Sequence, residues 1–99
     1  MNATPVVAKT AIHIVREIDQ RGLCQSRLIS SVAGAAIFTA SLVCQQCTDV
    51  DALELVKTVS MASGAADATI KEVCKELYPY MDRILPPAYR GSDLSVLLH

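Results

Sequence analysis

The sequence predicts an all-α protein, and three observations support this fold class. Apolar residues recur three and four positions apart over several stretches, which is the spacing of an amphipathic helix. No segment alternates apolar and polar residues for long enough to form a strand. Gly22, Gly64 and Pro79 stand between the apolar stretches, where they end helices. The 99 residues, 52% of them hydrophobic, suffice for one small domain with a single core.

The first helix is expected from Thr4-Pro5 to about Gln20. Thr4 is a favourable N-cap, Pro5 suits the first helical position, and Gly22 ends the helix. At about 100° per residue, one broad arc is apolar and should be buried. That arc contains Val7, Ala8, Ala11, Ile12, Ile14, Val15 and Ile18. The opposite, solvated arc contains Lys9, His13, Arg16, Glu17 and Gln20.

The second helix is expected to begin between Ser26 and Ser30 and to extend to about Val43. Residues 32–40 are small or apolar nearly all round. A helix without a polar face is buried, so this one should occupy the centre of the domain. Residues 44–50 read as a polar connection.

The third and fourth helices are expected to be joined by a Gly turn. Asp51 and Glu54 have capping-box-like spacing, and the third helix ends near Ser63, before Gly64. Its inward residues are Leu53, Val56 and Val59, with Met61 as a further candidate. Asp67 is placed to cap a fourth helix that runs to Leu77-Tyr78 and stops at Pro79. This layout is that of a helix-turn-helix, which can present its second helix to a DNA major groove.

The fourth helix divides into an inner and an outer face, and the chain after it reads as an irregular tail. The inner stripe consists of Ile70, Val73, Cys74 and Leu77. The outer face consists of Ala68, Lys71, Glu72 and Lys75. From Pro79 onward we expect irregular structure.

Enzymatic, metal and membrane functions are not indicated. Cys44 and Cys47 have metal-ligand or redox spacing, but no second ligand pair and no βαβ context accompany them, so we interpret them as ordinary helix-end cysteines. Cys24 and Cys74 read as small core residues, and His13 as a surface residue. No nucleophile–base pair, phosphate loop or carboxylate dyad appears, so we expect no enzyme, no cofactor and no metal. No apolar stretch approaches the roughly 18 residues of a membrane span, and no signal peptide precedes the domain, so reduced thiols and no membrane contact are expected.

Three segments occur in an order that resembles one family. Residues 31–41, residues 63–71 and the stretch from Tyr78-Pro79 to Leu85-Pro86 look like the second, C-terminal cyclin-like repeat of the general transcription factor IIB family (TFIIB, with the archaeal TFB). The resemblance runs from about Val6 to Tyr89. It implies a cyclin-like bundle of four to five helices over residues 1–90, with 91–99 as a C-terminal tail. Because such a repeat normally has five helices, the first would be missing here.

The resemblance implies a transcription-initiation module in the nucleus. Such a module binds the TATA-binding protein and promoter DNA and acts with the RNA polymerase machinery. Its base-contacting positions correspond to Ala68 and Lys71, where the family usually has Val and Arg, and Thr69 between them matches. Lys75 is expected near the DNA. Candidates for neutralising phosphates are Arg27, Lys57 and Arg21.

Charge keeps two other functions open. The chain carries a net charge of −1, and residues 51–78 contain three basic against five acidic side chains. This acidic surface and the apolar excess favour a cyclin-like protein–protein adaptor without direct DNA contact. A third interpretation is an unrelated helical bundle that self-associates. Exposed apolar surface would in either case favour a homodimer.

Overall fold

Helices make up the architecture of the chain. The computed structural model describes residues 5–45 and 49–89. The long helices are α1 (Pro5–Gln20), α2 (Ile29–Gln45), α3 (Asp49–Ser63) and α4 (Asp67–Leu77). A short helix η1 (Tyr78–Tyr80), one turn of α5 (Met81–Ile84) and η2 (Pro87–Tyr89) follow. No strand occurs in these two ranges, so the predicted all-α class is confirmed, and the bundle is consistent with a cyclin-like fold.

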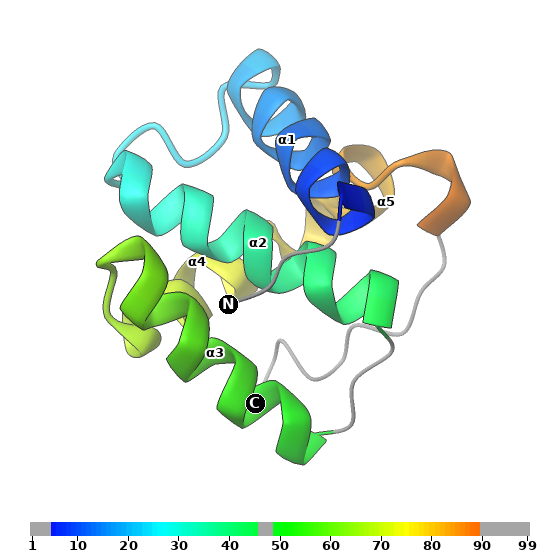
Figure 1. Ribbon diagram of the computed structural model, residues 1–99. Helices are drawn as coiled ribbons and strands as arrows, with labels where there is room; N and C mark the ends of the chain where they lie inside the picture. The colour runs from blue at the N-terminus through cyan, green and yellow to red at the C-terminus, as the bar shows by residue number, and fades with distance from the viewer. Residues whose placement is uncertain (1–4, 46–48, 90–99) are drawn as a thin grey trace.

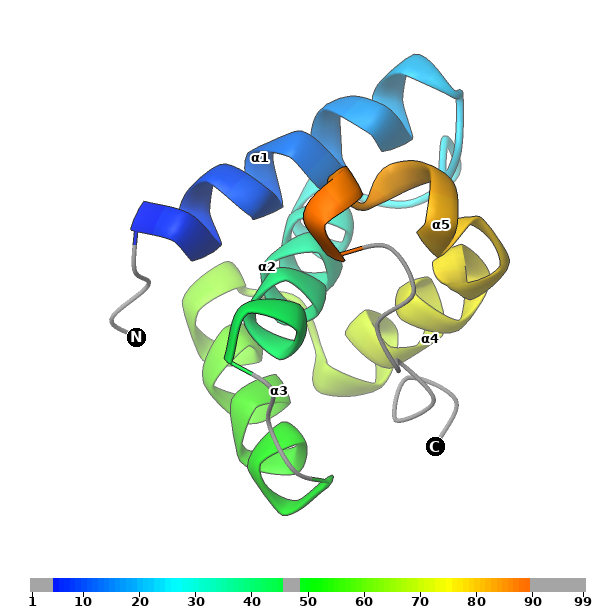
Figure 2. The ribbon, with the colours of Figure 1, turned by 90° about the vertical axis from the view of Figure 1, so that its right-hand side faces the viewer.

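Helix α2 lies at the centre, as its composition predicts. It packs against α1, α3 and α4, which surround it when the molecule is viewed along its axis (Figure 2). Ala35, Ala36 and Ala40 are completely buried. At Gly34 an added Cβ would lie 3.1 Å from Ile70 Cδ1 on α4, so the missing side chain lets the two helices approach closely.

Helix α1 buries a narrower stripe than predicted. The buried apolar residues are Val7, Ala11, Ile14 and Ile18. Ala8, Ile12 and Val15 are exposed instead, because α1 contacts only α2 and α5 substantially in the described part of the chain. Thr10 is buried and its hydroxyl donates to the Val6 carbonyl at 2.9 Å. The predicted end is confirmed, since Gly22 adopts a φ of 67° just beyond Gln20. The expected cap Thr4 lies outside the described residues.

The connection between α2 and α3 is shorter than predicted. Helix α2 continues to Gln45, and α3 begins at Asp49, so Asp51 lies in the first turn and is not the N-cap. Residues 46–48 lie outside the described part. Val56 and Val59 are buried as expected, whereas the inward placement of Met61 is wrong, because this side chain is 88% exposed. The side chain of Leu53 lies outside the described part.

The turn between α3 and α4 follows the predicted pattern with one correction. Gly64 has a φ of 79°, a conformation that glycine adopts without steric cost, and its N–H donates to Ser60. Ala66 occupies the N-cap position, and Asp67 is the first helical residue. The Asp67 carboxylate accepts the Ala68 N–H at 2.8 Å. The predicted inner stripe is confirmed, since its four residues are all buried: Ile70, Val73, Cys74 and Leu77.

The expectation of an irregular tail after Pro79 is wrong up to Tyr89. Met81, Ile84 and Leu85 are buried in the common core, and α5 packs against α1. The short helices form because these apolar residues recur at helical spacing, although prolines flank them. Residues 90–99 lie outside the described part. Among the described helices, none combines the length and the apolar character that crossing a membrane requires.

Candidate functional site

The outer face of α4 carries the residues expected near DNA. Because the helix turns its apolar stripe toward the core, Ala68 and Lys75 are exposed, and Thr69 and Lys71 are half-buried. The connection to α3 fixes the N-terminus of this helix, with Asp67 in the first turn and Lys75 in the last. Both charges suit the helix dipole. The four predicted positions therefore share one helix and do not belong to the core.

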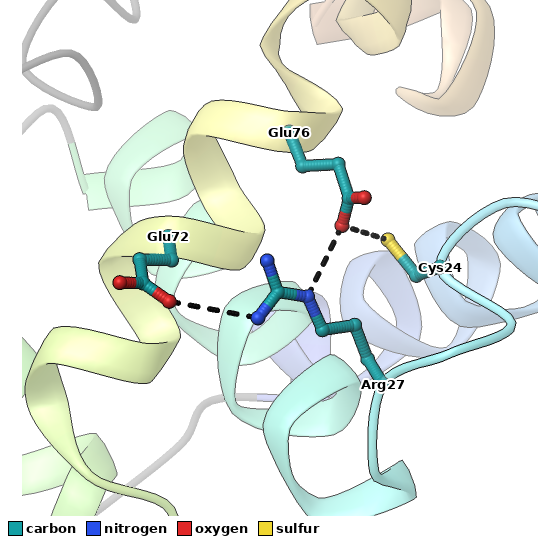
Figure 3. A network of polar contacts seen from close by, with 4 residues as sticks. All are labelled: Cys24, Arg27, Glu72 and Glu76. Carbon is teal, nitrogen blue, oxygen red and sulfur yellow. Dashed lines mark hydrogen bonds and ion pairs between the residues drawn. The ribbon is translucent and has the colours of Figure 1, made fainter.

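Arg27 lies beside α4, between two carboxylates (Figure 3). Its Nη1 is 3.5 Å from Glu72 Oε2, and its Nε is 3.3 Å from Glu76 Oε2. The arginine comes from the connection between α1 and α2, so these ion pairs join that connection to the outer side of α4. Arg27 was expected to neutralise phosphate. The structure places it close to the expected DNA-facing helix, but its charge is paired with protein carboxylates.

Cys24 also belongs to this group; it packs against the predicted core but is only partly buried there. It is half-buried, has a φ of 56°, and its Sγ donates to Glu76 Oε2 at 3.3 Å. Burial and the hydrogen bond to Glu76 raise the pKa of the Cys24 thiol to about 11. At neutral pH the thiol is therefore protonated, which suits a hydrogen-bond donor and not a nucleophile.

Cys74 is a core residue, as predicted. It is completely buried on the inner side of α4, and burial raises the pKa of its thiol to about 12. Thr39 on α2 lies within 3.9 Å of its sulfur.

The remaining predicted basic residues lie on other elements. Lys57 is exposed on α3. Arg21 lies just beyond α1, where its Nε pairs with Glu17 Oε2 at 3.1 Å. Neither takes part in the group around Arg27.

The described residues contain no group of three or more His, Cys, Asp or Glu that could hold a metal ion. Cys44 contacts Thr10, with Sγ 3.6 Å from Oγ1, and its hydrogen bond to Tyr89 raises the pKa of that phenol. Cys47 lies outside the described residues, so the pair Cys44 and Cys47 is not tested. His13 is half-buried on α1.

Sequence reasoning missed two features. One is the pairing of Arg27 with Glu72 and Glu76: the sequence shows the two acidic residues four positions apart on one helix, but nothing in it indicates that Arg27 is their partner. The other is a groove of about 500 Å³ between the end of α1 and the start of α2. Val15, Ile29 and Val32 contribute its apolar lining, and Ile29 is 86% exposed.

Comparison with known proteins points to one class, the transcription initiation factors. The chain is 33% identical over 92 residues to transcription initiation factor IIB of Oryza sativa subsp. japonica. The match covers 93% of this chain and 26% of that protein, so the chain spans about a quarter of its relative's length. No family model and no solved structure matches. The likeness supports a TFIIB-like relationship.

Proposed function

We propose that this chain is a transcription-initiation module that binds the complex of TATA-binding protein and promoter DNA. The main support is the likeness to factor IIB over 93% of the chain. The order of the helices and the sequence from Ser63 to Lys71 further suggest the second cyclin-like repeat, over residues 1–90. The expected C-terminal tail, residues 91–99, lies outside the described residues.

In this function α3 and α4 act as a helix-turn-helix with α4 nearest the DNA. Ala68 and Lys75 lie on the side of α4 that is turned away from the core, and the half-buried Thr69 and Lys71 lie on its two flanks. Lysine offers a point charge rather than a bidentate fork, so Lys71 is suited to a phosphate or a single base acceptor. Ala68 offers a small apolar contact. Lys57 on α3 adds a further positive charge.

The module acts by positioning other proteins on the promoter and catalyses no covalent step. Docking on the promoter complex fixes where and in which direction the RNA polymerase machinery assembles, which places the protein in the nucleus. With a net charge of −1, the chain gains little from phosphate attraction alone. Binding therefore depends on the TATA-binding protein as the first contact.

The direct test is fluorescence anisotropy of a labelled TATA-containing duplex, titrated with this chain at two salt concentrations. We expect salt-sensitive binding that appears only when the TATA-binding protein is present. Lys71→Ala should weaken it by about fivefold, the effect of one lost phosphate or base contact. The matched control is Lys9→Ala, which removes an exposed lysine from α1. Unchanged affinity for the Lys71 variant would remove α4 from the DNA interface.

A second candidate is a cyclin-like adaptor that binds protein without touching DNA. The groove beside Val15 and Ile29 favours it, since exposed apolar surface is typical of partner sites. Absence of binding to the duplex, with or without the TATA-binding protein, would select this function.

A further inference from the structure

One arginine contacts two acidic residues that stand one turn apart on α4. Glu72 and Glu76 are four positions apart, so their carboxylates lie on the same side of the helix. The Arg27 guanidinium reaches both, at 3.5 Å and 3.3 Å, through different nitrogens. Figure 3 shows the side chain extending from the connection between α1 and α2 into the space between them.

The backbone of that connection holds Arg27 in place. Its N–H donates to the Cys24 carbonyl at 3.0 Å, which closes a turn. The Cys24 thiol donates a hydrogen bond to Glu76 Oε2, the same oxygen that Arg27 Nε contacts. The Arg27 side chain is 31% exposed, less than either of its carboxylate partners. The backbone of Arg27 is therefore held by the turn, and its guanidinium is held by α4.

The pairing changes the charge of the surface around α4. The helix carries Lys71 and Lys75 against Asp67, Glu72 and Glu76, a net charge of −1. Such a surface repels a polyanion. With Arg27 included, the local charges balance to zero. Because Arg27 compensates the charge of Glu72 and Glu76, these carboxylates repel a phosphate that approaches the two lysines less strongly.

We propose that Arg27 is a positioning residue for DNA binding: it neutralises Glu72 and Glu76 so that Lys71 and Lys75 can contact phosphate. Arg27 itself touches protein carboxylates and not DNA. The inference rests on the proposed function, because it assumes that α4 faces DNA. It gives Arg27, Glu72 and Glu76 a role in DNA binding, although none of the three is among the proposed DNA contacts.

Arginine suits this position better than lysine. Its planar fork can engage two acceptors at once, whereas an ammonium group is a single point charge. Arg27→Lys keeps the charge and should bind the promoter complex more tightly than Arg27→Gln.

The experiment uses the same anisotropy assay with the TATA-binding protein and the duplex present. Arg27→Gln makes the local charge −1, and its affinity should fall by about fivefold. Glu72→Gln with Glu76→Gln leaves Arg27 unopposed, and affinity should rise above that of the wild type. The triple variant, Arg27→Gln with both Glu→Gln changes, has a local charge of +1. Its affinity should equal or exceed that of the wild type.

The triple variant separates neutralisation from direct contact. If Arg27 bound phosphate itself, or if its ion pairs mattered only for folding, the triple variant would stay weaker than the wild type, and the proposal would be overturned. Arg16→Gln is the matched control, because it removes the same charge from an exposed position on α1. Circular dichroism and thermal melting establish that each variant is folded. Should Arg27→Gln fail to fold, the double Glu→Gln variant still decides, since unchanged or weaker binding contradicts the proposal.

The titration of the wild type distinguishes failure of the proposed function from failure of the role of Arg27. No binding of the wild type to the promoter complex refutes the proposed function, and this inference with it. Binding of the wild type together with equal affinity of Arg27→Gln refutes only the role of Arg27.

Discussion

Two cysteine residues, Cys24 and Cys74, keep their thiol protons well above neutral pH. Burial raises both thiol pKa values above the ordinary 9, to about 11 for Cys24 and about 12 for Cys74. The hydrogen bond to Glu76 adds to the shift at Cys24. Because the folded chain holds these protons more tightly than the unfolded chain, they contribute stability that is complete below about pH 9. That contribution is lost as the pH rises toward the folded pKa values.

We expect the free energy of unfolding to fall between about pH 8 and about pH 10.5. Urea denaturation followed by circular dichroism at the two pH values measures it. Part of the fall comes from Cys74, at about 1.4 kcal/mol per pH unit above the unfolded pKa. Cys74→Ala lowers stability at both pH values by opening a cavity, but its loss between them should be smaller than that of the wild type. An identical loss in both proteins would contradict the assignment.

At the scale of elements, α5 connects the end of the described chain to the core. Ile84 is completely buried, and Met81 and Leu85 are nearly so. The element has only four residues, so its stability comes from this burial and not from helix propensity. Substitutions here should therefore act on the whole fold.

We expect Ile84→Ala to lower the free energy of unfolding by about 2–4 kcal/mol, the cost of deleting a fully buried isoleucine side chain. Urea denaturation measures the change. Met61→Ala is the matched control: it also truncates a large apolar side chain, but one that is 88% exposed, and we expect a change of at most about 0.5 kcal/mol. Similar losses in both variants, or a small loss in Ile84→Ala, would show that α5 is not part of the common core.

Long periodic elements were predictable from sequence, and the short ones were not. The bounds of α1 follow from Pro5 and Gly22, and the inner stripe of α4 follows from apolar spacing. The centrality of α2 follows from its small residues. The α5 turn was not predicted, because it has only four residues between prolines and its helical form depends on packing. The inward placement of Met61 ignored its spacing: at about 100° per residue it lies roughly 200° from the buried Val59, on the solvent side of α3.

The candidate site also has a part that was predictable from sequence and a part that was not. Helical periodicity alone places Ala68, Lys71 and Lys75 on the outer side of α4, where the structure also has them. The partners of Arg27 could not be predicted, because Glu72 and Glu76 are 45 and 49 residues away in the chain. Such a contact depends on how the connection between α1 and α2 folds against α4. The local charge around α4 is therefore a tertiary property.

At the scale of the whole molecule, the bundle leaves large apolar side chains uncovered along the edge formed by α1 and the start of α2. Leu28 and Ile29 are 74% and 86% exposed at the start of α2, and Ile12 is 53% exposed on α1. The groove of about 500 Å³ is lined in part by Val15 and Ile29. Exposed apolar surface of this kind favours association, either with a partner or with a second copy. A homodimer that covers this edge is therefore the outcome to test first.

We expect the purified chain to elute from a size-exclusion column at a volume that shifts toward the dimer as its concentration rises. Ile29→Glu should abolish the shift, because a charge in a closed apolar contact costs several times more than the contact contributes. The same substitution should leave the free energy of unfolding nearly unchanged, since Ile29 is 86% exposed in the single chain. Met61→Glu is the matched control: it is equally exposed, lies on α3 and does not line the groove, and should elute like the wild type. A wild type that stays monomeric at every concentration would refute the homodimer, and this edge would then remain free for a different protein.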